Sequence, residues 1–183
     1  MQDMINQRPF RFSYEDSCKL LQRLGYLDAG KLPPVPDHRP EYGDEQPLGV
    51  NFFRTFVGEG DLENLTLPRT FFGRSEVGPV SFKNTDLSGS TLCWNDFNGV
   101  NFTDADLSGC DLRASHFSEI VFVRANLRNA DLRQSSFEAC EFTDADMRGA
   151  KLTHAQRREI LPSDRQLREI DWQESDGEEP FGG

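Results

Sequence analysis

A period of five residues is the feature that most constrains how this chain can fold. Every fifth residue from Phe82 to Leu152 is Phe, Leu or Met, and the residue two positions earlier is usually small or β-branched. A helix places neighbours on one face at steps of three and four residues, and a strand does so at steps of two. A period of five therefore requires the chain to turn a corner in each unit, so that the central residue always points inward.

A second period, of twenty residues, shows how the units combine. The central residues run Phe-Leu-Leu-Phe and then start again, as at Phe82, Phe102, Phe122 and Phe142. A unit too short to bury its own apolar residue must stack on copies of itself. The sequence therefore predicts an all-β solenoid with four units per coil, in which like side chains stack at roughly 4.8 Å per coil.

Several units also carry a known motif. Segments 105–109, 125–129 and 130–134 read ADLSG, ANLRN and ADLRQ. They resemble the A(D/N)LXX unit of pentapeptide-repeat proteins, and the resemblance extends over residues 50–153. It implies a right-handed quadrilateral parallel β-helix. The motif is specific for the fold, whereas members of the family differ in function.

The flanking sequence predicts helical caps at both ends of the solenoid. The expected segments are an N-terminal helix and proline-rich capping arm (1–47), the β-helix (48–153), a C-terminal helical cap (154–173) and an acidic disordered tail (174–183). Ser13 is expected to cap a helix over roughly 14–24, and the prolines that follow exclude a helix or a central strand. The first coils are irregular, with Gly60 and Leu65 at two inward small positions. The arm is interpreted either as a cover for the first coil or as a partner-binding segment.

The C-terminal segment reads as two short helices. Thr153 and Ser163 are the expected caps. Two uses of the apolar residues remain open: they cover the last coil, or they form a two-fold homodimer interface. These residues are Ile160, Leu161, Leu167, Ile170 and Trp172.

Neither a cofactor site nor a catalytic site is predicted. Asp104, Asp106 and Ser108 begin like a calcium loop, but the twelfth position, which needs a bidentate Glu, is Ser115. No phosphate-binding or zinc-protease motif occurs, and the four cysteines are expected to be buried thiols, with Cys110 and Cys140 on opposite walls. No stretch of eighteen apolar residues is present, and Met1–Asn6 lacks a basic and apolar leader. A cytoplasmic, non-enzymatic protein without metal or cofactor is therefore expected.

Charge limits the choice of partner. The formal net charge is −11, of which residues 80–153 carry −4. This net charge disfavours direct binding of nucleic acid. The family resemblance implies a different relation to DNA, because quinolone-resistance and mycobacterial members are rods that imitate duplex DNA in the groove of a type II topoisomerase such as DNA gyrase. The candidate partner surface comprises Asp86, Asp106, Asp111, Asp131, Asp146, Val121, Val123 and Trp94.

Two functional hypotheses follow for this surface. In the first, the acidic columns, Asp86, Asp106 and Asp146 on one face and Asp111 and Asp131 on the next, imitate DNA. Four arginines among them favour instead an ordinary solvated face of mixed sign: Arg113, Arg128, Arg133 and Arg148. The alternative is an immunity, inhibitor or scaffold protein that captures another protein without DNA mimicry, with Val121, Val123 and Trp94 as contacts. Both hypotheses describe an acidic binding protein with a protein partner.

Overall fold

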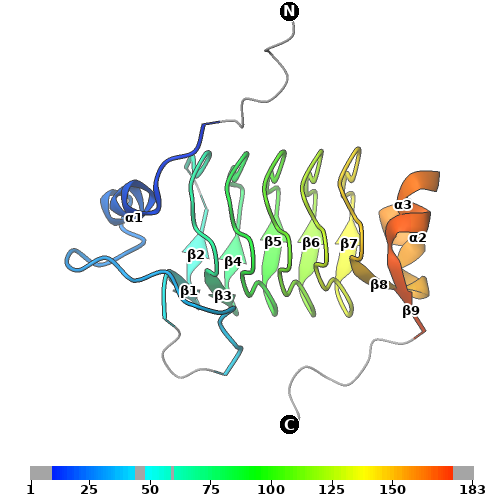
Figure 1. Ribbon diagram of the computed structural model, residues 1–183, viewed down its shortest axis with the longest axis horizontal. Helices are drawn as coiled ribbons and strands as arrows, with labels where there is room; N and C mark the ends of the chain where they lie inside the picture. Colours follow the sequence, from blue (N-terminus) through cyan, green and yellow to red (C-terminus); the bar gives the residue numbers. More distant parts are fainter. Residues whose placement is uncertain (1–9, 44–47, 59, 175–183) are drawn as a thin grey trace, which may run out of the picture.

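Residues twenty positions apart pair with one another along the coil, so one turn of the chain contains twenty residues. Phe52 pairs with Phe72, for example, and Phe97 pairs with Phe117. The structure, a computed structural model, describes residues 10–43, 48–58 and 60–174. Figure 1 shows the turns stacked in sequence order along the long axis of a rod. The predicted quadrilateral parallel β-helix is confirmed.

The strands are short and all of their pairings are parallel. One sheet contains, in order, β2 (Phe56–Val57), β4 (Glu76–Val77), β5 (Asp96–Asn98), β6 (His116–Ser118) and β7 (Ser136–Glu138). Two further pairs join β1 (Asn51–Phe53) to β3 (Phe71–Gly73) and β8 (Lys151–Thr153) to β9 (Asp171–Gln173). Isolated bridges such as Asp86 with Asp106 continue the same pairing on the other walls.

Each complete coil has four faces, named here by the inward residue of one coil. The inward residues of the Phe102 face are Leu62, Phe82, Phe102, Phe122 and Phe142, and those of the Leu107 face are Leu67, Leu87, Leu107, Leu127 and Met147. On the Leu112 face they are Phe52, Phe72, Leu92, Leu112, Leu132 and Leu152. On the Phe117 face they are Val57, Val77, Phe97, Phe117 and Phe137.

These inward side chains form the core. None of them is more than 6% exposed, which confirms the predicted inward positions from Phe52 to Leu152. The phenylalanines stack on their equivalents in the next coil. The rings of Phe102 and Phe122 lie 5.5 Å apart at 10°, and those of Phe97 and Phe117 lie 5.0 Å apart at 8°. Burial of one Leu or Phe side chain stabilises the coil by roughly 1.5–3 kcal/mol, so the four columns together supply the driving force.

Small inward residues tie neighbouring coils together. At the corner between the Leu112 and Phe117 faces, the Ser115 hydroxyl donates to the Leu92 carbonyl at 2.8 Å and accepts from the Asn95 amide at 3.1 Å. Ser135 repeats both bonds one coil later. Buried hydroxyls are therefore satisfied at these positions. Of the two irregular inward positions, Leu65 is buried as expected, but Gly60 is exposed, so its predicted inward placement is wrong.

The N-terminal helix covers the open end of the first coil. Helix α1 (Tyr14–Arg23) begins after Ser13, whose hydroxyl accepts from the Asp16 amide, as predicted. Cys18 and Leu21 on its inner face are fully buried in the core cluster. The ring of Tyr26 packs edge-on against Phe52 at 5.8 Å. Backbone edges of the first coil are thereby shielded from other chains.

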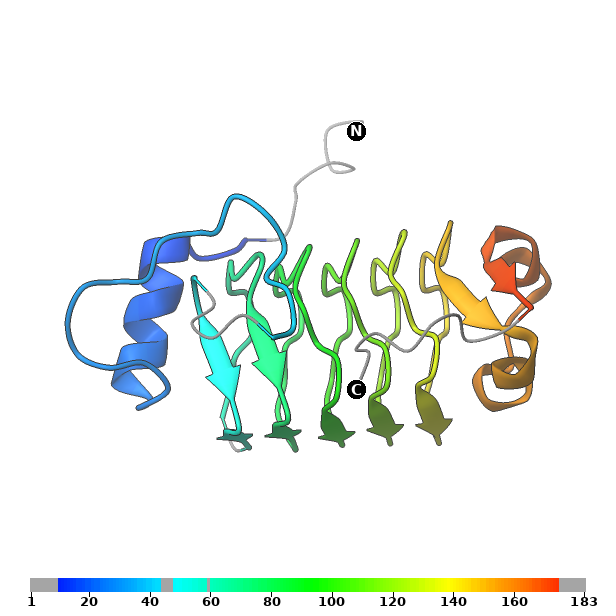
Figure 2. The ribbon, with the colours of Figure 1, turned by 90° about the horizontal axis from the view of Figure 1, so that it is seen from below.

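A proline-rich arm, defined here as residues 32–43, follows the N-terminal helix. Figure 2 shows it leaving the α1 end of the rod and running across the first coils. Its contacts with the coil lie mainly on the Leu112 face, where Thr91 donates to the Pro40 carbonyl. The start of the chain (Met1–Asn6) and, beyond Glu174, the predicted acidic tail lie outside the described residues.

The C-terminal cap is a duplication of ten residues. The pattern (T/S)xxQxREI occurs at 153–160 and again at 163–170. The first copy contains η1 (His154–Gln156) and α2 (Arg157–Ile160), and the second contains α3 (Asp164–Glu169). None of the helices in the described ranges is long and apolar enough to cross a membrane.

One glutamine in each copy joins the cap to the last coil. Gln156 accepts from the Thr153 amide and donates through Nε2 to the carbonyls of Leu132 and Ser135, at 2.8 and 2.7 Å. Gln166 repeats this arrangement with the carbonyls of Phe142 and Ala145. Each side chain therefore caps a helix and also satisfies carbonyls of the last coil.

Two details of the cap differ from a helical cover of the last coil. Ile160 and Ile170 are buried, but Leu161 is 81% exposed at a left-handed residue that ends α2, so it does not cover the last coil. After α3 the chain returns to the coil register as β9, and Trp172 pairs with Leu152. The helices replace three faces of one coil while preserving the twenty-residue period.

We expect Leu107→Ala to lower the free energy of unfolding by about 2–5 kcal/mol, because the substitution leaves a cavity within a packed column. Urea denaturation provides the measurement. The matched control is Asn98→Ala at an exposed position of β5, for which a change within about 0.5 kcal/mol is expected. Equal losses in the two variants would contradict the inward column.

The Gln156→Ala variant removes the donor to two carbonyls at the end of the coil. Because buried acceptors lose their partner, we expect the unfolding free energy to fall by roughly 1–3 kcal/mol. Gln173→Ala is the control, since the Gln173 amide donates only to the neighbouring Asp171 carbonyl among the described residues, at 3.4 Å. A Gln156 variant as stable as the control would show that the cap is held by apolar contacts alone.

Candidate functional site

The structure places the five candidate aspartates in the two predicted columns. Asp86, Asp106 and Asp146 lie on the Leu107 face, with Asn126 between the last two. Asp111 and Asp131 pair on the Leu112 face. All five occupy the position just before the inward leucine or methionine. The columns themselves are therefore as the sequence predicts, and the question is what the carboxylates do there.

Each of these carboxylates accepts a hydrogen bond from the backbone amide two residues later. The donors are Ser88, Ser108, Arg113, Arg133 and Arg148. Such a bond fixes the turn at each corner, as aspartate and asparagine do in turns generally. Asn126 does the same for Arg128, which shows that the turn needs an oxygen acceptor and not a charge.

Arginines neutralise three of the five aspartates. Arg113 and Arg133 bind Asp111 and Asp131 through two nitrogens each, with the shortest distances 2.7 Å. Arg113 also approaches Asp131 on the next coil at 3.8 Å. Arg148 binds Asp146 in the same bidentate way, with Nε 2.8 Å from Oδ1.

These ion pairs lower the pKa values of two aspartates. Burial by itself raises the pKa of Asp131, but the hydrogen bonds and charge of Arg133 outweigh it and hold the pKa below its usual value. Hydrogen bonds from Arg148 are the main reason why the pKa of Asp146 is also lowered. Both aspartates are therefore ionised and internally paired near neutral pH, which differs from the exposed charges of a phosphate backbone.

A different wall carries carboxylates that have no partner in the described part of the chain. The acidic sheet face, defined here by Glu76, Asp96, Glu119 and Glu138, is the outer side of the Phe117 face. All four residues are exposed, and none of their carboxylates makes an ion pair or hydrogen bond with another described residue. His116 lies between the coils of Asp96 and Ser136, and its Nδ1 is 2.8 Å from the Ser136 hydroxyl.

The sequence contains a pattern that indicates this face, although the pattern is less regular than the aspartate columns. Segments 75–79, 95–99, 115–119 and 135–139 contain no Lys or Arg, whereas the segments of Asp111, Asp131 and Asp146 each contain an arginine. Glu76 and Asp96 precede the inward residue, whereas Glu119 and Glu138 follow it, so these acids form no regular motif. Sorting the charges by face, and not by position in the repeat, would have identified them.

The remaining candidates do not form one surface. Val121 and Val123 flank Phe122 on the Phe102 face and are half-buried, with Val121 between Asn101 and Glu141 in the ladder. Trp94 is 44% exposed and lies at the corner between the Leu112 and Phe117 faces. The structure therefore separates the two valines from the tryptophan.

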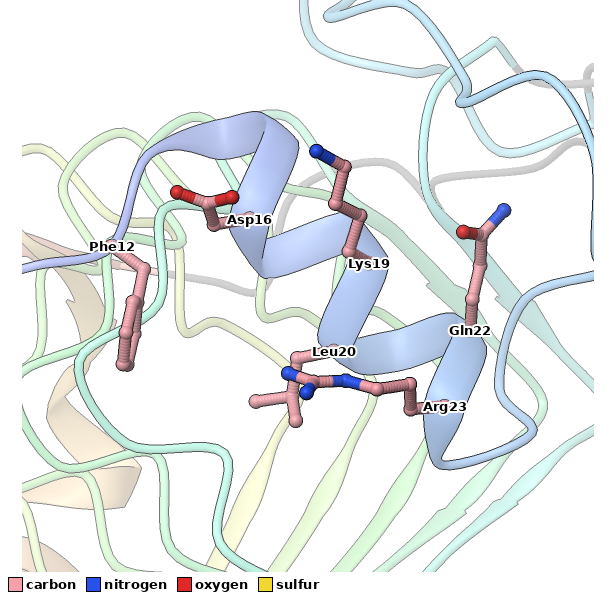
Figure 3. Close-up of a pocket in the computed structure, with 6 residues that line it drawn as sticks. All are labelled: Phe12, Asp16, Lys19, Leu20, Gln22 and Arg23. Carbon is pink, nitrogen blue, oxygen red and sulfur yellow. The ribbon is translucent and has the colours of Figure 1, made fainter.

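One hollow of the described surface lies beside the N-terminal helix. A hollow of about 710 Å³ borders α1 and is lined by Phe12, Asp16, Lys19, Leu20, Gln22 and Arg23. Figure 3 shows the Arg23 side chain reaching toward Leu20 there. Lys19 is paired with Glu15 at 2.6 Å. Among the described residues, no three His, Cys, Asp or Glu side chains are grouped to hold a metal, and the four cysteines are free thiols.

Comparison with known proteins agrees with the coil geometry. Residues 93–160 match a family model described as a pentapeptide repeat region. This part of the chain is a pentapeptide-repeat region. No curated protein matches its sequence significantly.

Several solved pentapeptide-repeat structures resemble this protein. Rfr23 from the cyanobacterium Cyanothece 51142 is 19% identical, with a TM-score of 0.43, over 57% of this chain and 64% of that chain. The present chain thus spans less than two thirds of Rfr23. QnrB1, a plasmid-mediated fluoroquinolone resistance protein, is 15% identical, with a TM-score of 0.48, over 68% and 70% of the two chains. A protein of the Arabidopsis thaliana thylakoid lumen is 27% identical, with a TM-score of 0.32, over 63% and 71%.

The matched residues cover only part of the pentapeptide-repeat coil. The match begins at Cys93 and ends at Ile160, so it includes the first helical copy of the cap. Coils between residues 50 and 92 lie outside the match, although they share its pairing. Prolines and bulky residues at repeat positions, such as Leu65 and Pro68, distinguish these first coils from the repeat consensus.

Replacing Asp131 with Asn tests the internal pairing through its pH dependence. The turn acceptor is kept, so only the charge is lost, and the partly buried pair is expected to contribute about 0.5–1 kcal/mol at pH 7. Because the folded pKa of Asp131 is lowered, this contribution is present above the unfolded pKa of about 3.9 and is lost as the pH falls through the folded pKa. Urea denaturation of both proteins across pH 2–7 measures the difference, and a difference independent of pH would contradict the assignment.

Proposed function

We propose that this pentapeptide-repeat protein is a binding protein whose acidic sheet face contacts a basic surface of a protein partner. The observation that supports this proposal is a set of four exposed carboxylates that have no partner among the described residues. Glu76, Asp96 and Glu138 lie on one continuous parallel sheet, β2-β4-β5-β6-β7, and Glu119 directly follows β6. Opposite charges across an interface speed association and select the partner. No catalytic step is included in the proposal.

The coil gives this face a fixed shape. Its strands pair in register from β4 to β7, and the phenylalanines beneath them stack at 5.0 and 5.3 Å. Side chains held on packed strands lose less conformational freedom when a partner binds than side chains on a loop. The acidic sheet face is therefore preorganised for a flat, complementary partner surface.

The low charge density of the acidic sheet face favours a partner surface other than a DNA-binding groove. The acidic sheet face spans three inter-strand spacings, or about 15 Å. Over that length duplex DNA carries about nine phosphate charges, at one per roughly 1.7 Å, whereas this face carries four carboxylates. The aspartate columns add only Asp86 and Asp106, which are half-buried, because the other three members are paired with arginine.

DNA mimicry toward a type II topoisomerase such as DNA gyrase is the second candidate. It is supported by the net charge of −11 and by the family resemblance. Both candidates require a protein partner and place no nucleic acid on the surface. Immunity, inhibitor and scaffold roles are specific forms of the first candidate. The cytoplasmic location and the homodimer through the C-terminal helices stay predictions.

Neutralising the acidic sheet face tests the proposal. The triple variant Glu76→Gln, Asp96→Asn, Glu138→Gln and the matched variant Asp111→Asn, Asp131→Asn, Asp146→Asn each remove three negative charges. We expect partners retained by the wild-type protein from a lysate of its host at low salt to be lost from the first variant by at least about tenfold, and kept by the second. Quantitative mass spectrometry of the bound proteins measures this.

Three controls separate the outcomes. Thermal unfolding shows that both variants are folded. Equal loss of partner from both variants would show that net charge, and not this face, determines binding. A DNA gyrase supercoiling assay tests the second candidate: inhibition or protection by the wild-type protein at micromolar concentration supports mimicry, and no effect at that concentration contradicts it.

A further inference from the structure

Three outward residues in the first coils of the Leu112 face are buried, although most outward positions of the coil are exposed or half-buried. Phe71, Thr91 and Cys93 point away from the core but are 3%, 1% and 0% exposed. Two coils later on the same face, Asp131 and Arg133 are half-buried. Phe71, Thr91 and Cys93 are named here the covered strip. A second layer must therefore lie over this part of the wall.

The proline-rich arm is that layer. The Thr91 hydroxyl donates to the Pro40 carbonyl, and Pro36 and Pro40 are both buried. Arg39 donates to the Gly109 carbonyl at 3.2 Å, one coil beyond Thr91. Its charge also acts on the thiol of Cys93, the pKa of which is raised to about 12, mainly by burial.

Tyr42 of the arm contacts two further residues of the wall. Tyr42 lies 6.1 Å from the ring of Phe71, and its hydroxyl accepts from Arg74 Nε at 2.6 Å. The Arg74 guanidinium lies over the Tyr42 ring at 6.0 Å. Gly73 leaves room for the aromatic rings, because a Cβ there would lie 2.7 Å from Phe71. The wall therefore makes three contacts with the arm. The Thr91 hydroxyl donates to a carbonyl, the Gly109 carbonyl accepts from a guanidinium, and Phe71 with Arg74 contacts a tyrosine.

The arm lacks the backbone pairing that joins neighbouring coils. Residues 32–40 make no backbone–backbone hydrogen bond in the described part of the chain, and four of the nine are prolines. The coil, by contrast, pairs each turn with its neighbours. Segments held by a few side-chain contacts open at a lower free energy than the cooperative core. The arm is therefore the part of this wall that can leave while the coil stays folded.

We propose that the covered strip is a docking groove for an extended, proline-containing peptide segment that carries an arginine and a tyrosine, and that the arm occupies this groove until a partner segment of the same chemistry replaces it. Proline-containing segments suit such a site because they are already extended and lose little entropy on docking. The seated arm shows which contacts the incoming segment would make: Thr91 to a carbonyl, the Gly109 carbonyl to a guanidinium, and Phe71 with Arg74 to a tyrosine. This groove is separate from the acidic sheet face.

Reaction of single thiols tests whether the arm opens. One protein keeps Cys93 alone (Cys18→Ala, Cys110→Ala, Cys140→Val), and its matched control keeps Cys110 alone (Cys18→Ala, Cys93→Ser, Cys140→Val). Both thiols are fully buried, but Cys110 lies inside the coil. Since a buried thiol with a raised pKa reacts only after it becomes exposed, we expect a disulfide reagent at pH 8 to modify Cys93 at least about tenfold faster than Cys110. Adding Tyr42→Ala should raise the Cys93 rate further and leave the Cys110 rate unchanged.

A peptide supplied in trans tests the docking itself. A synthetic peptide of residues 34–43, added in excess to the Cys93-only protein with Tyr42→Ala, is expected to slow modification of Cys93 at least about threefold. The control peptide replaces its arginine and tyrosine with alanine and should give no protection. Equal reaction rates for Cys93 and Cys110 would show that the arm does not open separately, and would overturn the proposal. Opening without protection by the first peptide would also overturn it, because the groove would then not bind such a segment.

Discussion

Stacking of each inward side chain on its equivalent twenty residues later is the interaction on which this structure depends. A single coil has almost no interior, so its Phe and Leu side chains are buried only when a neighbouring coil covers them. The backbone follows the same rule, since amides of one coil donate to carbonyls of the next, as Phe102 does to Val121 and Leu107 does to Asn126. Packing and hydrogen bonding therefore share one period, and a change in either would shift both.

The first and last coils each lack a neighbouring coil on one side, so other elements must cover them. Helix α1 places Cys18 and Leu21 over the first coil, and the duplicated C-terminal motif places Gln156 and Gln166 over the last. The C-terminal solution keeps the spacing of the coil: two ten-residue copies occupy the length of one turn, and β9 resumes the pairing. The cap is thus a modified coil in which helices replace three faces.

Charges on the surface follow from the same geometry. Aspartates just before the inward leucine or methionine accept the turn hydrogen bonds, and an arginine two positions later neutralises three of the five. The Phe117 face has strands in place of those turns and lacks the arginines, so its carboxylates remain available to a partner. The regular acidic motif is therefore structural, and the irregular acids are the better candidates for binding.

The sequence by itself determined the coil, the inward columns and both helix caps at Ser13 and Ser163, because these depend on local spacing and on side chains within a few residues of one another. It placed the candidate aspartates in correct columns but could not show that Arg113, Arg133 and Arg148 bind them, since side-chain pairing depends on the corner conformation. Only the tertiary structure revealed the buried outer wall under the arm and the return of Trp172 to the ladder. Those contacts join residues such as Pro40 and Thr91, which are remote in the chain and meet only after the coil has formed.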